Sequence, residues 1–87
     1  MDYEDICETL MRKCMTMADE KYIAYAYEAL KNFSEDELVG ECDLCVGESI
    51  RAKRIIALCG RYLKAAGRER ADIREDIAQA VDDFYNY

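Results

Sequence analysis

The sequence contains no histidine, no proline and no tryptophan, and its serines are limited to Ser34 and Ser49. Without histidine there is no imidazole to act as an acid or base near pH 7, no HExxH metal site and no histidine-based triad. The four glycines are isolated from one another, so neither a GxGxxG pattern nor a P-loop can be drawn. Carboxylate pairs remain, but an acidic helical chain presents such pairs by chance. We therefore expect no enzyme and no cofactor.

Long apolar runs and an export leader are also absent. The sequence has no stretch of roughly 18 uncharged apolar residues, the length needed to cross a membrane. The chain also does not open with a charged-then-apolar leader. These absences predict a cytoplasmic protein that binds no membrane. Of the 87 residues, 52% are hydrophobic and 36% are charged. This composition excludes intrinsic disorder and suits a single helical domain over residues 1–87.

Five cysteines stand out in this composition. An odd number without an export signal favours free thiols in a reducing compartment over a disulfide framework. Cys7, Cys14 and Cys59 lie on apolar helical faces, where cysteine behaves as a small hydrophobe. Cys42 and Cys45 form the sole CxxC, which lacks the second ligand pair of a structural zinc site. We expect core thiols and no metal; a four-thiolate site and a CxxC redox couple are the alternatives.

Apolar residues recur at helical spacing nearly throughout, and no window alternates with period two for long enough to indicate a strand. Five amphipathic helices are predicted, near residues 2–17, 19–32, 34–47, 49–66, and from 69 or 72 to 87. A capping box of Ser34 and Glu37 introduces the third helix, while Ser49 caps the fourth and Gly67 stops it. Short connections favour antiparallel neighbours, so the expected fold is all-α, a compact single-domain bundle of about five helices.

The same spacing selects the residues expected to be buried. They are Tyr3, Ile6, Cys7, Leu10, Met11, Cys14 and Met15 in the first helix; Tyr22, Ile23, Ala26, Ala29, Leu30 and Phe33 in the second; Leu38, Val39, Cys42, Cys45 and Val46 in the third; Ala52, Ile55, Ile56, Cys59, Tyr62, Leu63 and Ala66 in the fourth; and Ile73, Ile77, Ala80, Val81 and Phe84 in the fifth. Gly60 interrupts the fourth helix at a cost of about 1 kcal/mol relative to alanine. This indicates that another group closely approaches its backbone.

The net charge of -7 conceals a segregation of charge along the chain. Residues 34–48 carry six acids and no base, whereas residues 51–70 carry seven bases and one acid. Four bases share the outer face of the fourth helix: Lys53, Arg54, Arg61 and Lys64. Five acids share the outer face of the fifth: Asp72, Glu75, Asp76, Asp82 and Asp83. These faces are expected to point away from each other, and pairing of the bases with Glu48 and its acidic neighbours is the ordinary alternative.

These features favour a non-enzymatic protein-binding module, a small inhibitor or adaptor that occupies a surface of a larger protein. Tyrosine is enriched at interface hot spots, and four of the seven tyrosines are expected to be exposed enough to contact a partner: Tyr25, Tyr27, Tyr85 and Tyr87. The most specific form of the hypothesis is a phage or mobile-element inhibitor of a host nucleic-acid-processing complex. The fifth helix offers its carboxylates at about half the charge density of duplex DNA, so we expect partial DNA mimicry only.

Two other functions stay open. The basic face of the fourth helix could bind a nucleotide or nucleic acid, although nucleic-acid-binding domains are usually basic overall. Alternatively, the basic face of one copy could meet the acidic face of the next in a self-assembling structural protein. A salt-resistant assembly would instead use apolar contacts at Tyr25, Tyr27, Ile50 or Leu58. No motif is specific enough to carry a resemblance to a known family.

Overall fold

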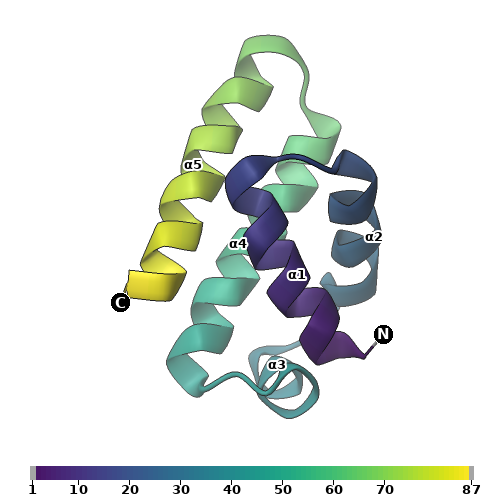
Figure 1. Cartoon of the computed structure of the whole chain (residues 1–87), viewed down its shortest axis with the longest axis vertical. Helices are drawn as coiled ribbons and strands as arrows, with labels where there is room; N and C mark the ends of the chain where they lie inside the picture. Colours follow the sequence, from purple (N-terminus) through teal and green to yellow (C-terminus); the bar gives the residue numbers. More distant parts are fainter. Residues whose placement is uncertain (1, 87) are drawn as a thin grey trace.

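The computed structural model describes residues 2–86, and this part of the chain contains five α-helices and no strand (Figure 1). They are α1 (Tyr3–Thr16), α2 (Glu20–Leu30), α3 (Glu35–Cys42), α4 (Val46–Lys64) and α5 (Gly67–Asn86). α4 and α5 run antiparallel, α1 crosses α4, α2 returns beside α1, and α3 lies at the end where α4 begins. The predicted all-α compact bundle is confirmed, with extents of 36 × 26 × 19 Å. No helix in residues 2–86 is long and apolar enough to cross a membrane.

Side-chain caps fix where the first three helices begin. The Asp2 and Asp19 carboxylates accept hydrogen bonds from backbone N–H groups in the first turns of α1 and α2. The capping box predicted before α3 is confirmed, because the Glu37 N–H donates to the Ser34 hydroxyl and the Ser34 N–H donates to the Glu37 carboxylate, both at 3.2 Å. Each such cap contributes about 1 kcal/mol to helix stability.

The end of α3 differs from the prediction. The helix stops at Cys42, and Asp43 takes a left-handed backbone conformation with φ 54°, so Gly47 does not terminate it. Aspartate tolerates this conformation better than most residues. Cys45 therefore lies outside the helix and is exposed, which corrects its assignment to the core.

The start of α4 is also earlier than predicted. The helix begins at Val46, and the Cys45 N–H donates to the Glu48 carboxylate at 3.0 Å. Ser49, the expected cap, lies inside α4, where it is buried and its hydroxyl donates to the Val46 carbonyl oxygen at 2.7 Å. A serine hydroxyl can be satisfied within a helix as well as at its start, so the residue alone did not fix the boundary.

A small polar network joins α2, α4 and α5. Glu20, the first residue of α2, accepts a hydrogen bond from the Tyr62 hydroxyl at 2.7 Å and pairs with the Arg70 guanidinium at 3.3 Å. The hydrogen bond to Glu20 raises the pKa of Tyr62. Arg70 also donates to the Tyr62 carbonyl oxygen at 3.3 Å. These contacts hold the turn between α4 and α5, where Gly67 has φ 62° and begins α5 before the predicted start at Glu69 or Asp72.

The buried side chains of all five helices form one cluster. The predicted stripe of α5 is confirmed, because four of its residues are buried and Phe84 packs against the cluster. Four other predicted core residues are exposed: Tyr3, Met15, Val46 and Ala66. Met15 lies about 110° from the centre of the buried stripe of α1 at 100° per residue. Tyr3 begins α1 at an end of the bundle, where its ring packs edge-on against Phe33 with 4.8 Å between centroids.

The close approach predicted at Gly60 is confirmed. A Cβ atom at this position would lie 2.6 to 2.7 Å from three atoms at the end of the Tyr27 ring. Tyr27 of α2 therefore lies across the backbone of α4, and it is half-buried rather than exposed. Leu58, expected as a possible exposed contact, is buried with 8% of its surface accessible. Both residues help to hold α4 in the bundle.

Candidate protein-binding surfaces

The solvent-facing side of α4 carries a continuous stripe of exposed residues. At 100° per residue they fall within about 100° of arc. This stripe, the α4 outer face, comprises Val46, Ile50, Lys53, Arg54, Ala57, Arg61 and Lys64. Val46 is 68% exposed and Ile50 is 51% exposed. The stripe thus joins two aliphatic side chains at its beginning to four bases along the rest of its length.

The sequence predicted the bases of the α4 outer face but not its aliphatic end. A helix that begins at Ser49 leaves Val46 in the preceding segment, where it was assigned to the core. Because α4 actually begins at Val46, Val46 and Ile50 are one turn apart on the same face as Lys53. The earlier start converts a predicted basic face into a mixed aliphatic and basic surface.

The bases of this face have no acidic partner in the described chain. Within residues 2–86, no ion pair or hydrogen bond involves the side chains of Lys53, Arg54, Arg61 or Lys64. Glu48, the acid named in the ordinary alternative, is instead affected by the charge of the neighbouring Arg51. The pKa of Glu48 is lowered mainly by the hydrogen bond from the Cys45 N–H and further by the charge of Arg51. The four outer bases are therefore available to a partner.

Two of these bases face different edges of α4. Lys53 lines a pocket of about 170 Å³ between α2 and α4, together with Tyr27 and Phe33. Arg54 lines a pocket of about 260 Å³ between α4 and α5, together with Asp83. This divergence favours contact with an extended surface over capture of a single phosphate group.

The acidic residues predicted on α5 are on its surface. Asp72, Glu75, Asp76 and Asp82 are exposed, whereas Asp83 is half-buried. Asp83 accepts a hydrogen bond from Gln79 at 3.1 Å and shares its pocket with Arg54. The acidic and basic faces therefore meet along one edge, contrary to the expectation that they point away from each other.

The candidate tyrosines do not form one surface. Tyr25 on α2 is 54% exposed and Tyr85 near the end of α5 is 52% exposed. α2 and α5 lie on opposite sides of the bundle (Figure 1). Tyr27 is half-buried against Gly60, and Tyr87 lies outside the described residues. Each exposed tyrosine therefore belongs to a different edge of the molecule.

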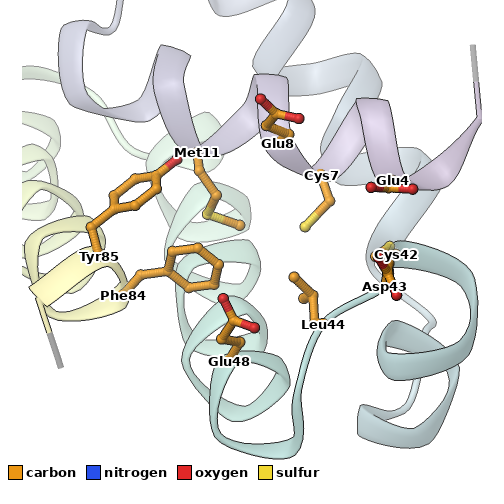
Figure 2. Close-up of a pocket in the computed structure, with 10 residues that line it drawn as sticks. All are labelled: Glu4, Cys7, Glu8, Met11, Cys42, Asp43, Leu44, Glu48, Phe84 and Tyr85. Carbon is orange, nitrogen blue, oxygen red and sulfur yellow. The ribbon is translucent and has the colours of Figure 1, made fainter.

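A further pocket, which sequence reasoning missed, lies between α1, the α3–α4 connection and the end of α5 (Figure 2). It has a volume of about 180 Å³, and we call it the acidic pocket. Its apolar side chains point toward one another: Cys7, Met11, Leu44 and Phe84. Four carboxylates surround them: Glu4, Glu8, Asp43 and Glu48. Tertiary packing unites these residues, and the acid-only run over residues 34–48 was the one signal in the sequence.

Burial and nearby carboxylates raise the pKa values of groups in the acidic pocket. Asp43 is the main cause of the raised pKa of Glu4, and burial and other nearby acids add to it. Burial, with smaller effects of Cys42 and Glu48, raises the pKa of Cys7 to about 12, so its thiol is neutral at pH 7. Burial also raises the pKa of Tyr85, and Glu8 adds to that effect. The pocket is thus negatively charged around an apolar floor.

The cysteines divide into four buried thiols and one exposed thiol. Cys7, Cys14, Cys42 and Cys59 are buried as predicted, and the Cys14 and Cys59 sulfur atoms lie 3.3 Å apart between α1 and α4. Cys45 is exposed. Among residues 2–86, no three cysteine, aspartate or glutamate side chains are grouped so that they could hold a metal ion.

Comparisons with models of protein families, with curated proteins and with solved structures find no match to this chain.

Proposed function

We propose that the protein is a non-enzymatic protein-binding module that docks on a larger protein through the α4 outer face. The observation that carries the proposal is the combination of two exposed aliphatic side chains with four bases that have no acidic partner within residues 2–86. Exposed apolar side chains that occur singly need no explanation, whereas a contiguous patch is typical of an interaction site.

The two parts of this face contribute differently to binding. Full burial of a fully exposed aliphatic side chain contributes about 1.5 to 3 kcal/mol, and Val46 and Ile50 contribute the share of this that corresponds to their exposed surface. The bases mainly accelerate association and fix the orientation of a partner with acidic groups. Because α4 is already packed against α2, α3 and α5, little backbone conformational entropy is lost on binding, and the entropic cost lies in ordering the lysine and arginine side chains. The matching partner presents an apolar patch bordered by carboxylates, and the module acts as an inhibitor or adaptor by covering that patch.

A finer form of the proposal is inhibition of a nucleic-acid-processing complex by partial DNA mimicry. This form uses the exposed carboxylates of α5, such as Asp72 and Asp76, rather than the α4 outer face. The two forms therefore predict different sensitivities to mutation.

The test compares two double variants that alter opposite surfaces. Ile50→Asp with Arg61→Glu changes the α4 outer face, and Asp72→Arg with Asp76→Arg changes α5. All four residues are exposed, so we expect each substitution to change stability by no more than about 1 kcal/mol. Arg54 and Asp83 are avoided because they line one pocket. Tagged proteins are isolated from cells that naturally make the chain, and captured partners are quantified by mass spectrometry.

We expect the α4 variant to capture at least about tenfold less partner than wild type, because truncation of a hot-spot residue has an effect of this size. The α5 variant should capture as much partner as wild type. Loss in the α5 variant alone would move the interface to α5 and favour DNA mimicry. Retention by both would reject both surfaces. If the captured partner is a second copy of this chain, the function is self-assembly instead. Circular dichroism and thermal unfolding of both variants serve as folding controls.

A further inference from the structure

The acidic pocket combines an apolar hollow with four lining carboxylates (Figure 2), and none of its lining residues belongs to the α4 outer face. The hollow is formed by apolar side chains rather than by the carboxylates. Met11 and Cys7 of α1 form its buried wall, and Leu44 and Phe84 reach into it from the α3–α4 connection and from α5. At about 180 Å³ it accommodates one long side chain. It is smaller than the roughly 300 to 1,000 Å³ typical of small-molecule sites.

The charged side chains that line this hollow are all carboxylates. Four carboxylates line the pocket, and no lysine or arginine in the part of the chain that the structure describes lines it. Two bases outside the lining act on its edge: the charge of Arg12 opposes the rise in the pKa of Tyr85, and the charge of Arg51 lowers the pKa of Glu48. Glu48 accepts the Cys45 N–H, which leaves Glu4, Glu8 and Asp43 to contact a bound cation.

The arrangement suits an organic cation better than a metal ion. Metal sites bring several ligands together at about 2.0 to 2.6 Å from the ion, and no such group exists within residues 2–86. Here the carboxylates stand around an apolar floor instead. A lysine or arginine side chain matches this pattern, because its methylene stem packs on apolar surface while its charged end stays with the acids.

We propose that the acidic pocket binds one lysine or arginine side chain from a basic segment of a partner protein. A protein segment fits better than a free amine, because the negative charge extends beyond the pocket. Asp2 and Asp5 on one side, and Glu41 on the other, add to the field at Glu4 and Cys42. Further bases of the same segment meet this surrounding charge, which also speeds their association.

The test uses a defined peptide. A fluorescent peptide of alternating arginine and alanine is titrated into the protein, beside an otherwise identical peptide in which neutral citrulline replaces arginine. We expect the arginine peptide to bind and the citrulline peptide not to bind. On the wild-type protein, NMR signals of the Met11 and Leu44 methyl groups should shift with the arginine peptide only, which locates binding without any substitution.

Two matched variants separate the pocket from general negative charge. Glu4→Gln with Glu8→Gln removes two pocket carboxylates, and Glu69→Gln with Glu75→Gln removes two exposed carboxylates of α5, so both have the same net charge. Because each exposed ion pair contributes about 0.2 to 1 kcal/mol, we expect the pocket variant to bind the arginine peptide about two- to thirtyfold more weakly. The α5 variant should bind as tightly as wild type, and more tightly than the pocket variant.

Three results would overturn the proposal. Equal binding of the citrulline peptide would remove the requirement for a cation. Equal loss of affinity in the two variants, or unshifted Met11 and Leu44 signals, would show that the arginine peptide responds to the net charge of the protein and does not bind in the pocket. Spermidine that binds as tightly as the peptide and shifts the same signals would make the pocket a site for free amines. None of these results bears on the α4 outer face, whose variants retain all the pocket residues.

Discussion

Replacement of Ile55 by alanine is expected to lower the free energy of unfolding by about 2 to 5 kcal/mol, whereas the same replacement at Ile50 should lower it by less than about 1 kcal/mol. Both residues lie in α4, but Ile55 is fully buried and Ile50 is 51% exposed. The change in helix propensity is identical in the two variants, so the difference between them reports burial alone. Because a chain of this length is stable by only about 4 to 13 kcal/mol, Ile55→Ala removes a large share of the total.

Urea unfolding followed by circular dichroism measures both losses. If Ile50→Ala and Ile55→Ala lower the free energy of unfolding equally, the inner and outer faces of α4 do not differ in burial. A larger loss at Ile50 would reverse the orientation of the helix and would remove the α4 outer face as a binding surface.

The second large effect is a separation of thiol reactivities. In the native protein, Cys45 should react with a thiol reagent at the rate of an exposed cysteine, since it lies between α3 and α4 and is exposed. Cys7, Cys14, Cys42 and Cys59 are buried and react only when the fold opens. Where their exposure requires global unfolding, which costs at least about 4 kcal/mol, their reaction should be slower by a factor of about 10³ or more.

Absorbance with Ellman's reagent counts the reacted thiols over time, and we expect one fast thiol in buffer and five in guanidinium chloride. Cys45→Ser should remove the fast phase and leave the other four unchanged. A fast phase of two or more thiols, or one that survives Cys45→Ser, would show that the core is assigned incorrectly.

The elements predicted best are those in which the local sequence pattern and the tertiary packing favour the same structure. In α5, the apolar spacing of Ile73, Ile77, Ala80 and Val81 is also the buried face. The capping box at Ser34 depends on residues within one turn, so the sequence contains all that is needed to predict it. The fold class follows from this agreement over most of the chain.

The features that were predicted wrongly lie where the local sequence is compatible with two different helix boundaries. Ser49 could either cap a helix or bond back to a carbonyl within one, and the hydrogen bond between the Cys45 N–H and Glu48 decided in favour of the earlier start. This one boundary moved Cys45 and Val46 from the predicted core to the surface. The unusual cost of Gly60 correctly signalled a close contact, but only the packing of α2 on α4 identifies Tyr27 as its source.

Of the two candidate surfaces, one could be predicted from helical spacing and the other could not. The bases of the α4 outer face follow from helical geometry alone, so the sequence sufficed to group them. The acidic pocket draws its carboxylates from α1, the α3–α4 connection and α4. No spacing rule relates Glu4 to Asp43, and their proximity depends on how α3 packs beside α1.

The most direct test of the binding proposal is site-specific photo-cross-linking in cells that naturally make the protein. Benzoylphenylalanine is introduced in place of Ile50 on the α4 outer face, and separately in place of Ala78, an exposed residue of α5. After irradiation, cross-linked products are separated by size and identified by mass spectrometry. We expect one defined product from position 50, containing a larger protein, and none from position 78. Cross-linking from position 78 alone, or no product from position 50, would contradict docking through the α4 outer face.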